Sequence, residues 1–401
     1  MLTSVDLNAV YKPGPEGGIF PVMRVLALNC GSSSVKSALI DTVQGRRMQE
    51  IHVDEVGGDL PAAVDKLLAS YRKLASSQAP EAVVHRVVHG GETFRDPTRL
   101  DDSVLAQIEQ LNHLAPLHNP PALAAINRAR ADLPDVPHFA VFDTAFHATL
   151  PDYAREYALP SDIRQRFGIR RFGFHGINHA HVAHSVAAYL RADVQTLRII
   201  SCHLGNGASV TAIDGGRSVD TSMGMTPLEG LVMGTRAGDV DPGVLLQLRR
   251  EGHLDADQLD DLLNKRSGLK GLAGTNDVRE IERRANAGDE GCILAIAMYV
   301  HRIRKYIGAY AAEMGGADVI AFTAGVGEHS ALIRRRCSER LEFMGVALDV
   351  ASNDALKLSS DHPLAAFNAA GSRVHLFAVR ADEELSMALA TASALGVNAK
   401  S

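Results

Sequence analysis

A pattern of strand, glycine turn and strand occurs twice in this chain, and it constrains the fold more than any other feature. In the first copy, apolar runs flank residues 29–36, which read NCGSSSVK. In the second copy, apolar runs at 197–204 and 209–214 flank the Gly-Asn-Gly of residues 205–207. Short apolar runs bounded by turn residues predict buried strands. Both copies contain Ser-Val and end in Ile-Asp. The repeat therefore predicts two similar halves facing a cleft, although two unrelated hairpins could share these letters.

The turn at residues 29–36 has a composition that suits phosphate. It combines a glycine, three hydroxyls, an amide and a lysine. Phosphate oxygens need such donors, and a glycine lets the backbone come close. An ordinary Ser/Gly hairpin turn is the alternative. The segment is not a Walker A loop, because the second glycine before the lysine is missing and a strand follows instead of a helix.

Strands and helices are expected to alternate along the rest of the chain. Further strands are predicted at 49–56, 81–90, 137–143, 318–322 and 374–379. Helices are predicted at 61–75, 100–111, 122–131, 257–264, 289–314, 330–341 and 382–395, with a glycine-rich loop at 267–275. This order indicates an α/β fold in which helices pack on the faces of mixed sheets.

Length and charge exclude several classes of protein. A chain of 401 residues predicts two or three domains. A net charge of −6 gives no support to a nucleic-acid surface. No apolar run approaches the roughly 18 residues that a membrane span needs. Four scattered cysteines without metal-type spacing suit a reducing cytoplasm. Residues 1–22 lack periodicity and predict a disordered extension, although translation could equally begin at Met23.

Two arginines are candidates for binding an anion. Arg86 lies within an apolar strand, where a cation is costly unless it meets an anion. That anion is either a ligand or a structural carboxylate. Arg236 lies between glycines in the loop 233–239, which would let it approach a ligand closely, although a loop arginine is more often solvated.

An acid, two histidines and a glycine turn complete the set. Asp143 ends a strand, where ligands bind in α/β proteins, or it caps the next turn. His175 is either packed or catalytic; its spacing to His179 suits a metal pair on a helix, but Gly176 would weaken a helix there. His203 precedes the second glycine turn, and residues 325–327 form a third. Such residues can hold phosphates and stabilise a phosphoryl group during transfer.

Eight longer motifs resemble the acetate kinase family. They lie at 29–36, 85–92, 115–121, 142–147, 172–176, 203–207, 220–238 and 322–328. The resemblance runs from about Val25 to the last helix. It implies two duplicated RNase-H-like domains around a nucleotide cleft, as in the acetate and sugar kinase, Hsp70 and actin superfamily, usually in a homodimer. The implied domains are 23–148 with about 381–401, and 149–380.

The resemblance implies phosphoryl transfer from ATP to acetate with Mg²⁺ or Mn²⁺, and it assigns roles by motif position. Arg86 would grip the substrate carboxylate, Asp143 would orient the substrate, and His175 and Arg236 would stabilise the transferring phosphoryl group. The substrate's methyl pocket would be lined by Val88, Leu117, Phe174 and Pro227. His118 and His203 would support catalysis. The metal would be near Asn29 and Glu383, with Glu384 the weaker choice. Phosphate and nucleotide would contact Ser32, Ser34, Lys36, His203, Leu204, Gly205, Asn206, Gly207, Asp277, Val278, Arg279, Gly325, Val326, Gly327, Glu328 and His329.

Four residues in three motifs depart from the family pattern. Ile177-Asn178 stands where the family has Thr-Ser, His329 replaces an asparagine, and Asp382 replaces another. These changes could alter phosphate, metal or base contacts. A propionate or butyrate kinase is the nearest alternative, because one methylene in an apolar pocket changes binding by only about 1–3 kcal/mol. A nucleotide-binding switch or chaperone ATPase is the alternative from another class, but it would not need Arg86.

Overall fold

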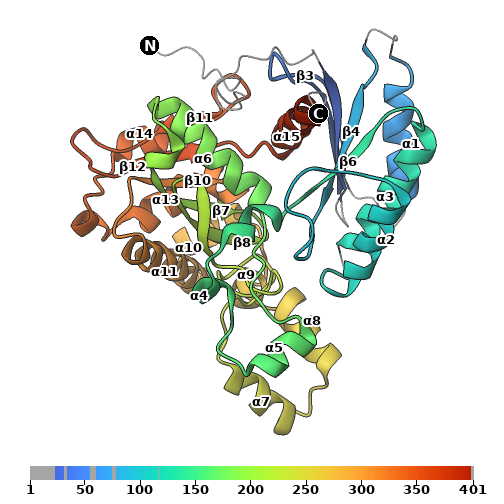
Figure 1. Cartoon of the computed structure of the whole chain (residues 1–401). Helices are drawn as coiled ribbons and strands as arrows, with labels where there is room; N and C mark the ends of the chain where they lie inside the picture. The colour runs from blue at the N-terminus through green and yellow to red at the C-terminus, as the bar shows by residue number, and fades with distance from the viewer. Residues whose placement is uncertain (1–22, 31–33, 55–59, 75–77, 117, 399–401) are drawn as a thin grey trace. The chain divides into compact units, whose positions relative to one another are not determined.

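The computed structural model describes residues 23–30, 34–54, 60–74, 78–116 and 118–398. These residues form two compact units. The described part of the N-terminal unit comprises 23–148, 174–181 and 382–398, and that of the C-terminal unit comprises 149–173 and 182–381 (Figure 1). The predicted extension at 1–22 lies outside the described residues, as do Ser32 and Leu117.

The N-terminal unit is built on a six-stranded mixed sheet in the order β3-β2-β1-β4-β6-β5. Its strands are β1 (Arg24–Cys30), β2 (Ser34–Asp41), β3 (Arg46–Asp54), β4 (Ala82–Val87), β5 (Thr98–Arg99) and β6 (His138–Phe142). Strand β1 pairs antiparallel with β2 and parallel with β4, and β4 pairs parallel with β6. Antiparallel β3 and β5 close the two edges.

Helices cover both faces of this sheet, because successive side chains of a strand point to opposite faces. Val25 and Ala27 of β1 pack in one cluster with the closing helix α15 (Glu383–Asn398). Leu26 and Leu28 pack in another with α1 (Leu60–Tyr71) and α3 (Asn119–Asp132). Helix α2 (Asp102–Gln110) packs beside α3. The end of the chain thus completes the core of the unit that contains its beginning.

The C-terminal unit repeats the same sheet. Its order, read from β9, is β9-β8-β7-β10-β12-β11, and each pair runs in the same relative direction as its counterpart. The strands are β7 (Arg198–Leu204), β8 (Ala208–Asp214), β9 (Arg217–Thr221), β10 (Val319–Thr323), β11 (Leu364–Ala366) and β12 (His375–Val379). Even the register shift recurs, just before Ile40-Asp41 in one copy and at Ile213 in the other. The α/β fold and its internal duplication are therefore confirmed.

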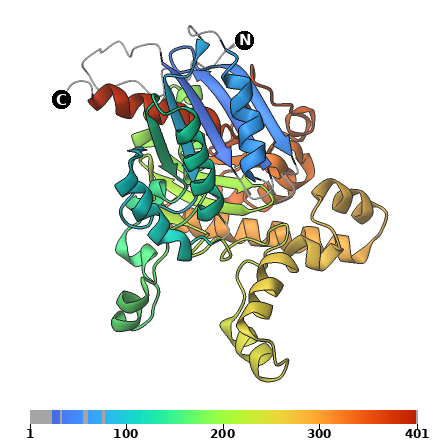
Figure 2. The ribbon, with the colours of Figure 1, turned by 90° about the vertical axis from the view of Figure 1, so that its right-hand side faces the viewer.

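Long helices pack on the second sheet, and shorter ones extend from it. Helix α11 (Glu290–Glu313) packs against β7 and β8, and the Tyr189 ring of α6 (Gly176–Leu190) contacts Phe377 of β12. In both views α7 lies at the end of this unit farthest from the sheet (Figures 1 and 2). The remaining helices are α4 (Asp152–Arg155), α5 (Ser161–Phe167), α7 (Pro242–Arg250), α8 (Ala256–Lys265), α9 (Gly268–Ala273), α10 (Val278–Asn286), α12 (Ala324–His329), α13 (Ala331–Ser338) and α14 (Val350–Ala355). Short 3₁₀ helices occur at Leu111–His113, Ala145–Thr149, Val194–Thr196 and Glu342–Met344.

One predicted loop and one predicted glycine turn are helical, so those two predictions were wrong. The segment 267–275 contains α9: Gly268 (φ +63°) is its first residue and Gly274 (φ +78°) caps its end. Glycine at a helix end adopts the left-handed conformation without strain, so it marks a boundary and not a loop. The Gly-Val-Gly at 325–327 lies inside α12, which begins directly after β10.

Two helix starts also differ from expectation. Helix α3 begins at Asn119, not Ala122, because prolines at its first positions lack only the N–H groups that have no helical partner there. Gly176 does not prevent a helix, because it is the first residue of α6. Within the part of the chain that the structure describes, no helix is long and apolar enough to cross a bilayer.

Candidate active site

Arg86 holds together a charged cluster in the N-terminal unit. It lies on β4, and its Nε and Nη2 donate to the two carboxylate oxygens of Asp143 at 3.0 and 2.6 Å. Its Nη1 pairs with Glu383 at 3.0 Å and donates to the Asn29 Oδ1 at 3.2 Å. The parallel pairing of β4 with β6 brings Arg86 near Asp143, which directly follows β6. Of the two anions expected for Arg86, the structure contains the protein carboxylate.

Burial and charge oppose each other in this cluster. Burial works against the charged form of Arg86, but the carboxylates of Asp143 and Glu383 outweigh it and raise its pKa. Burial also raises the pKa of Asp143, and the ion pair with Arg86 opposes that shift. A bidentate guanidinium–carboxylate pair is both strong and directional. The cluster is therefore a rigid polar site in which a second anion must share the guanidinium.

Further charged side chains bind Asn29 and the start of α15. The Asn29 Nδ2 donates to Glu383 at 2.8 Å and to Glu384 at 3.2 Å. Arg47 on β3 forms a bidentate pair with Asp382, at 2.6 and 2.8 Å. Burial raises the pKa of Glu384, and the neighbouring carboxylates Glu383 and Asp382 add to that shift. The departure Asp382 is thus an ion-pair partner at the start of α15.

Gly176 ties the beginning of α6 to Asp143. The Gly176 N–H donates to the Asp143 backbone oxygen at 2.9 Å. A Cβ at position 176 would lie 2.3 Å from that oxygen, so only glycine allows the approach. His175 has a positive φ of 58°, and His147 Nε2 donates to the neighbouring Phe174 oxygen at 2.9 Å. These contacts fix the backbone of His175 relative to Asp143 within the N-terminal unit.

Apolar and histidine side chains surround this segment. The buried ring of Phe174 meets His89 edge-on, with centroids 5.8 Å apart. The His89 backbone exchanges two hydrogen bonds of 3.1 Å with the side chain of Asn119. That exchange fixes the start of α3, where His118 is the residue before the helix. Val88 is half-buried directly after β4.

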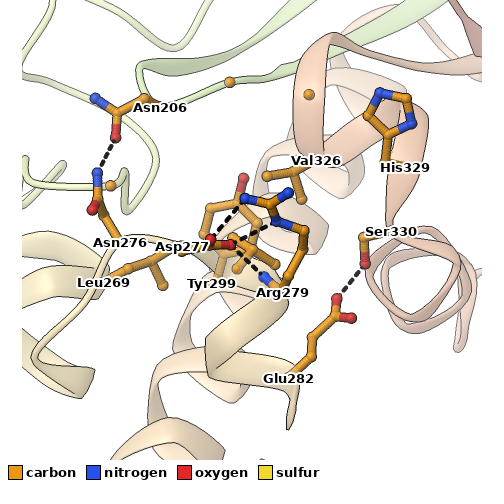
Figure 3. A pocket seen from close by; sticks show the side chains of 14 residues that line it. Asn206, Leu269, Asn276, Asp277, Arg279, Glu282, Tyr299, Val326, His329 and Ser330 are labelled. Atoms are coloured by element: carbon orange, nitrogen blue, oxygen red, sulfur yellow. Dashed lines mark hydrogen bonds and ion pairs between the residues drawn. The ribbon is translucent and has the colours of Figure 1, made fainter. Parts of the chain in front are cut away.

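A cavity of about 550 Å³ lies in the C-terminal unit (Figure 3). It is lined by Gly205, Asn206, Gly234, Leu269, Asn276, Asp277, Val278, Arg279, Glu282, Tyr299, Gly325, Val326, His329 and Ser330. The Asn276 side chain donates to Asn206 at 2.9 Å, Arg279 pairs with Asp277 at 2.8 Å, and Ser330 donates to Glu282. The volume is within the range typical of small-molecule sites. Glycines at two walls let a ligand approach the backbone.

Eight predicted nucleotide contacts line this cavity: Gly205, Asn206, Asp277, Val278, Arg279, Gly325, Val326 and His329. His203 and Leu204 are buried in β7, and Gly207 lies beyond the lining. Gly327 packs on Phe322, and the Glu328 Oε1 accepts from the Ala381 N–H at 2.8 Å. Sequence reasoning missed Gly234, Leu269, Asn276, Glu282, Tyr299 and Ser330. Ser330 could have been found next to the predicted glycine turn, but Tyr299 in a long helix gives no local signal.

The loop that carries Arg236 is held close to this cavity's wall. A Cβ at Gly234 would lie 1.9 Å from the Asn206 Oδ1, and one at Gly268 would lie 2.2 Å from the Met233 oxygen. Arg236 donates to the Pro227 oxygen at 3.2 Å. Burial lowers the pKa of Arg236, and no carboxylate among the described residues forms an ion pair with it. A desolvated cation without a carboxylate partner is suited to a ligand anion.

The predicted metal position contains oxygen donors of the kind that Mg²⁺ prefers. Glu383 and Asn29 supply a carboxylate and an amide oxygen in the Arg86 cluster. Among the described residues no group of three or more His, Cys, Asp or Glu could hold an ion. Mg²⁺ is typically bound by one or two carboxylates with water and substrate phosphate, not by an all-protein cage. The donor set therefore fits a metal that arrives with a nucleotide. Lys36 is exposed on β2 opposite Asn29; Ser34 begins that strand.

The two duplicated sheets define the class of protein: an α/β chain of the acetate and sugar kinase, Hsp70 and actin superfamily. Residues 49–389 match the model of the acetokinase family. An acetate kinase of Streptomyces coelicolor is 47% identical, over 92% of this chain and 96% of its own length. One of Clavibacter sepedonicus is 45% identical, over 93% and 99%.

Solved structures agree with this class. The acetate kinase of Porphyromonas gingivalis matches with a TM-score of 0.86 and 38% identity, over 93% of this chain and all of that one. A propionate kinase of Francisella tularensis matches with a TM-score of 0.82 and 34% identity, over 92% and 98%. The chain belongs to the acetokinase family, and it is a phosphotransferase with a carboxyl group as acceptor.

Proposed function

We propose that this chain is an acetate kinase that transfers the γ-phosphoryl group of ATP to acetate, reversibly and by direct in-line transfer. The observation that carries the proposal is the Arg86 cluster: a guanidinium in a half-buried strand position, next to Val88 and within one unit with Phe174. A small carboxylate with a methyl group needs such a cation and such apolar neighbours. An ATPase without an acyl substrate needs neither.

The chemistry of the acceptor explains why no strong base is required. An acyl carboxylate is already a nucleophile at neutral pH, so catalysis requires positioning and charge neutralisation. We assign the first task to Arg86 and Asp143, and the second to His175 and Arg236. ATP and a divalent metal follow from the family, and we propose Mg²⁺, with Mn²⁺ as a substitute, held near Asn29 and Glu383. The metal would neutralise phosphate charge in the transition state.

The C-terminal cavity supports the nucleotide part of the proposal. Asn206, Asp277 and Arg279 supply polar groups to the lining, and the glycines at 205 and 325 let a ligand approach the backbone. His329, where the family has asparagine, also lines it. We therefore expect the preference among ATP, GTP and CTP to respond to His329→Asn.

An assay that traps acyl phosphate with hydroxylamine tests the activity directly. With ATP, Mg²⁺ and acetate, the purified chain should give acetyl hydroxamate that depends on each of the three. Comparing kcat/KM for acetate, propionate and butyrate then decides the substrate. A clear preference for propionate would make the chain a propionate kinase, like the Francisella neighbour. ATP hydrolysis that ignores all three acids would contradict the proposal.

Two substitutions test the assigned roles. Arg236→Ala and His175→Ala should each lower kcat by about a hundredfold or more, as the loss of an oxyanion-type donor does. Matched exposed residues, Arg217→Ala and His253→Ala, should leave kcat unchanged. Near-normal turnover in Arg236→Ala or His175→Ala would exclude that residue from catalysis.

We also propose that the chain forms a homodimer through its C-terminal unit. Helix α7 buries none of its side chains, and Val244 and Leu246 on it are 44% and 54% exposed. Phe167 at the end of α5 is 55% exposed. A second copy would remove this apolar surface from water. Sedimentation should give a dimer for the native chain and a monomer for Leu246→Asp; a dimer in both would place the contact elsewhere.

A further inference from the structure

A cavity rich in arginine lies in the C-terminal unit, between α11 and the end of α13. Its volume is about 400 Å³, and it shares no lining residue with the nucleotide cavity. It is lined by Ala297, Val300, His301 and Arg304 of α11, and by Arg335, Arg336, Glu339 and Arg340 at the end of α13 and just after it. Four guanidiniums and one carboxylate therefore line a cavity on a chain whose net charge is −6.

Both walls of this arginine cavity are fixed by the fold. The four residues of α11 follow the spacing i, i+3, i+4 and i+7, so they share one face of that helix. The Arg304 Nη2 donates to the Arg336 backbone oxygen, which connects α11 to α13. Arg340 has a positive φ of 66°, which turns the chain directly after α13. The cations are thus positioned by packed elements and not by a free tail.

The charge of the cavity is not balanced by the protein. None of the four guanidiniums forms an ion pair with a carboxylate in the described parts of the chain. The Arg304 Nε is buried and has no hydrogen-bond partner among the described residues. A buried donor without an acceptor is costly. Cations at a helix C-terminus can serve the helix dipole, which would account for Arg335 and Arg336 but not for Arg304 in the middle of α11.

We propose that the arginine cavity binds a small anion that carries two or more phosphate charges. Guanidinium groups match phosphate oxygens in pairs, and Arg304, Arg336 and Arg340 offer several such donors around one space. The volume suits a small molecule. The proposal does not depend on the activity proposed above, because no residue of the candidate active site lines this cavity.

Calorimetric titration of the full chain with inorganic pyrophosphate tests this site. The titration is done at low salt, without nucleotide or divalent metal. The variant Arg336→Gln/Arg340→Gln changes two exposed cations and should weaken pyrophosphate binding by about tenfold or more. The control Arg217→Gln/Lys357→Gln removes the same charge from exposed positions elsewhere in the unit and should bind like the native chain. Inorganic phosphate should bind more weakly than pyrophosphate.

A second variant is expected to strengthen binding, so the test does not depend on whether the double variant folds. Glu339→Gln removes the one carboxylate of the lining and should tighten pyrophosphate binding several-fold. Thermal unfolding of each variant reports whether the fold is kept. Pyrophosphate that binds only in the nucleotide cavity would give one affinity in all four proteins, and that result would overturn the proposal. Such a result would leave the acyl-phosphate assay unaffected.

Discussion

At the scale of single residues, the Arg86 cluster predicts an unequal cost for removing its partners. Arg86→Met leaves Asp143 and Glu383, 2% and 14% exposed, with no cation between them. Breaking a buried pair in this way lowers the free energy of unfolding by about 3–5 kcal/mol. Asp143→Asn should cost less, because Arg86 keeps its 3.0 Å pair with Glu383. Urea unfolding at pH 7 measures both. Equal losses would mean that Glu383 does not share the charge of Arg86.

A buried histidine pair predicts sensitivity to acid. His85 on β4 and His138 on β6 share a hydrogen bond of 3.0 Å between ring nitrogens and stack at 5.3 Å. Burial lowers the pKa of His85 well below its usual range. As the pH drops below about 6.5, His85 becomes protonated in the unfolded chain but stays neutral in the folded chain. The free energy of unfolding therefore falls as the pH drops below about 6.5.

The variant His85→Phe isolates this contribution. It keeps a ring against His138 but cannot take up a proton. The slope of unfolding free energy between pH 6.5 and 5 should therefore become shallower, by up to about 1.4 kcal/mol per pH unit. Chemical unfolding at a series of pH values gives the slope. An unchanged slope would place the acid sensitivity in other groups, such as His89, whose pKa burial lowers to about 4.

At the scale of elements, the start of α6 depends on a glycine, Gly176, which has no side chain. Gly176→Ala would push a methyl group against the Asp143 oxygen, 2.3 Å from the ideal Cβ, and against Phe146. It should cost about 2 kcal/mol or more, and it should lower activity by displacing His175. Gly308→Ala is the matched control inside α11, where a Cβ meets nothing within 4 Å. That change should stabilise by about 0.5–1 kcal/mol. Thermal unfolding of the two variants should shift in opposite directions.

The elements that the sequence predicted are those with a strong local pattern. Val25 and Ala27 pack in one apolar cluster, and Leu26 and Leu28 pack in the other. These four apolar residues were enough to predict β1 from the sequence. Two of the missed elements lack such a pattern: β5 has two residues, and α9 consists largely of glycine and leucine. The helices α6 and α10 were also missed, although they span 15 and 9 residues. Glycine was taken as a mark of loops, but at Gly268 and Gly176 it permits a close approach between backbones. Such contacts join residues far apart in sequence, so no local rule finds them.

The candidate site could be predicted only in part, because many of its contacts also join residues far apart in sequence. Arg86 stood out because an arginine in an apolar strand needs an anion, and Asp143 because it ends a strand. Their pairing with Glu383 joins residues that are far apart in the sequence and depends on where α15 packs. Among the missed residues that line the C-terminal cavity, Leu269 and Tyr299 belong to helices whose own sequences carry no ligand signal.

At the scale of the whole molecule, the two sheets differ in which parts of the chain form their cores. The C-terminal sheet is built from residues 198–379, whereas the N-terminal sheet needs α15 from the end of the chain. Leu385, Met387 and Leu389 cover one of its faces. Each such side chain contributes about 1.5–3 kcal/mol when buried. The first unit is therefore expected to depend on the last twenty residues, and the second is not.

Truncation after Ala381 tests this dependence. It removes α15 and, with it, Asp382, Glu383 and Glu384, so Arg47 and Arg86 lose carboxylate partners as one apolar face of the sheet becomes exposed. Amide exchange should show protection lost in β1, β2, β4 and β6 and retained in β7, β8, β10 and β12. Truncation after Asn398 is the control and should preserve protection in both sheets. Loss of protection in both sheets after the larger truncation would mean that the two units fold as one, because the second sheet keeps all of its own strands and core helices in that variant.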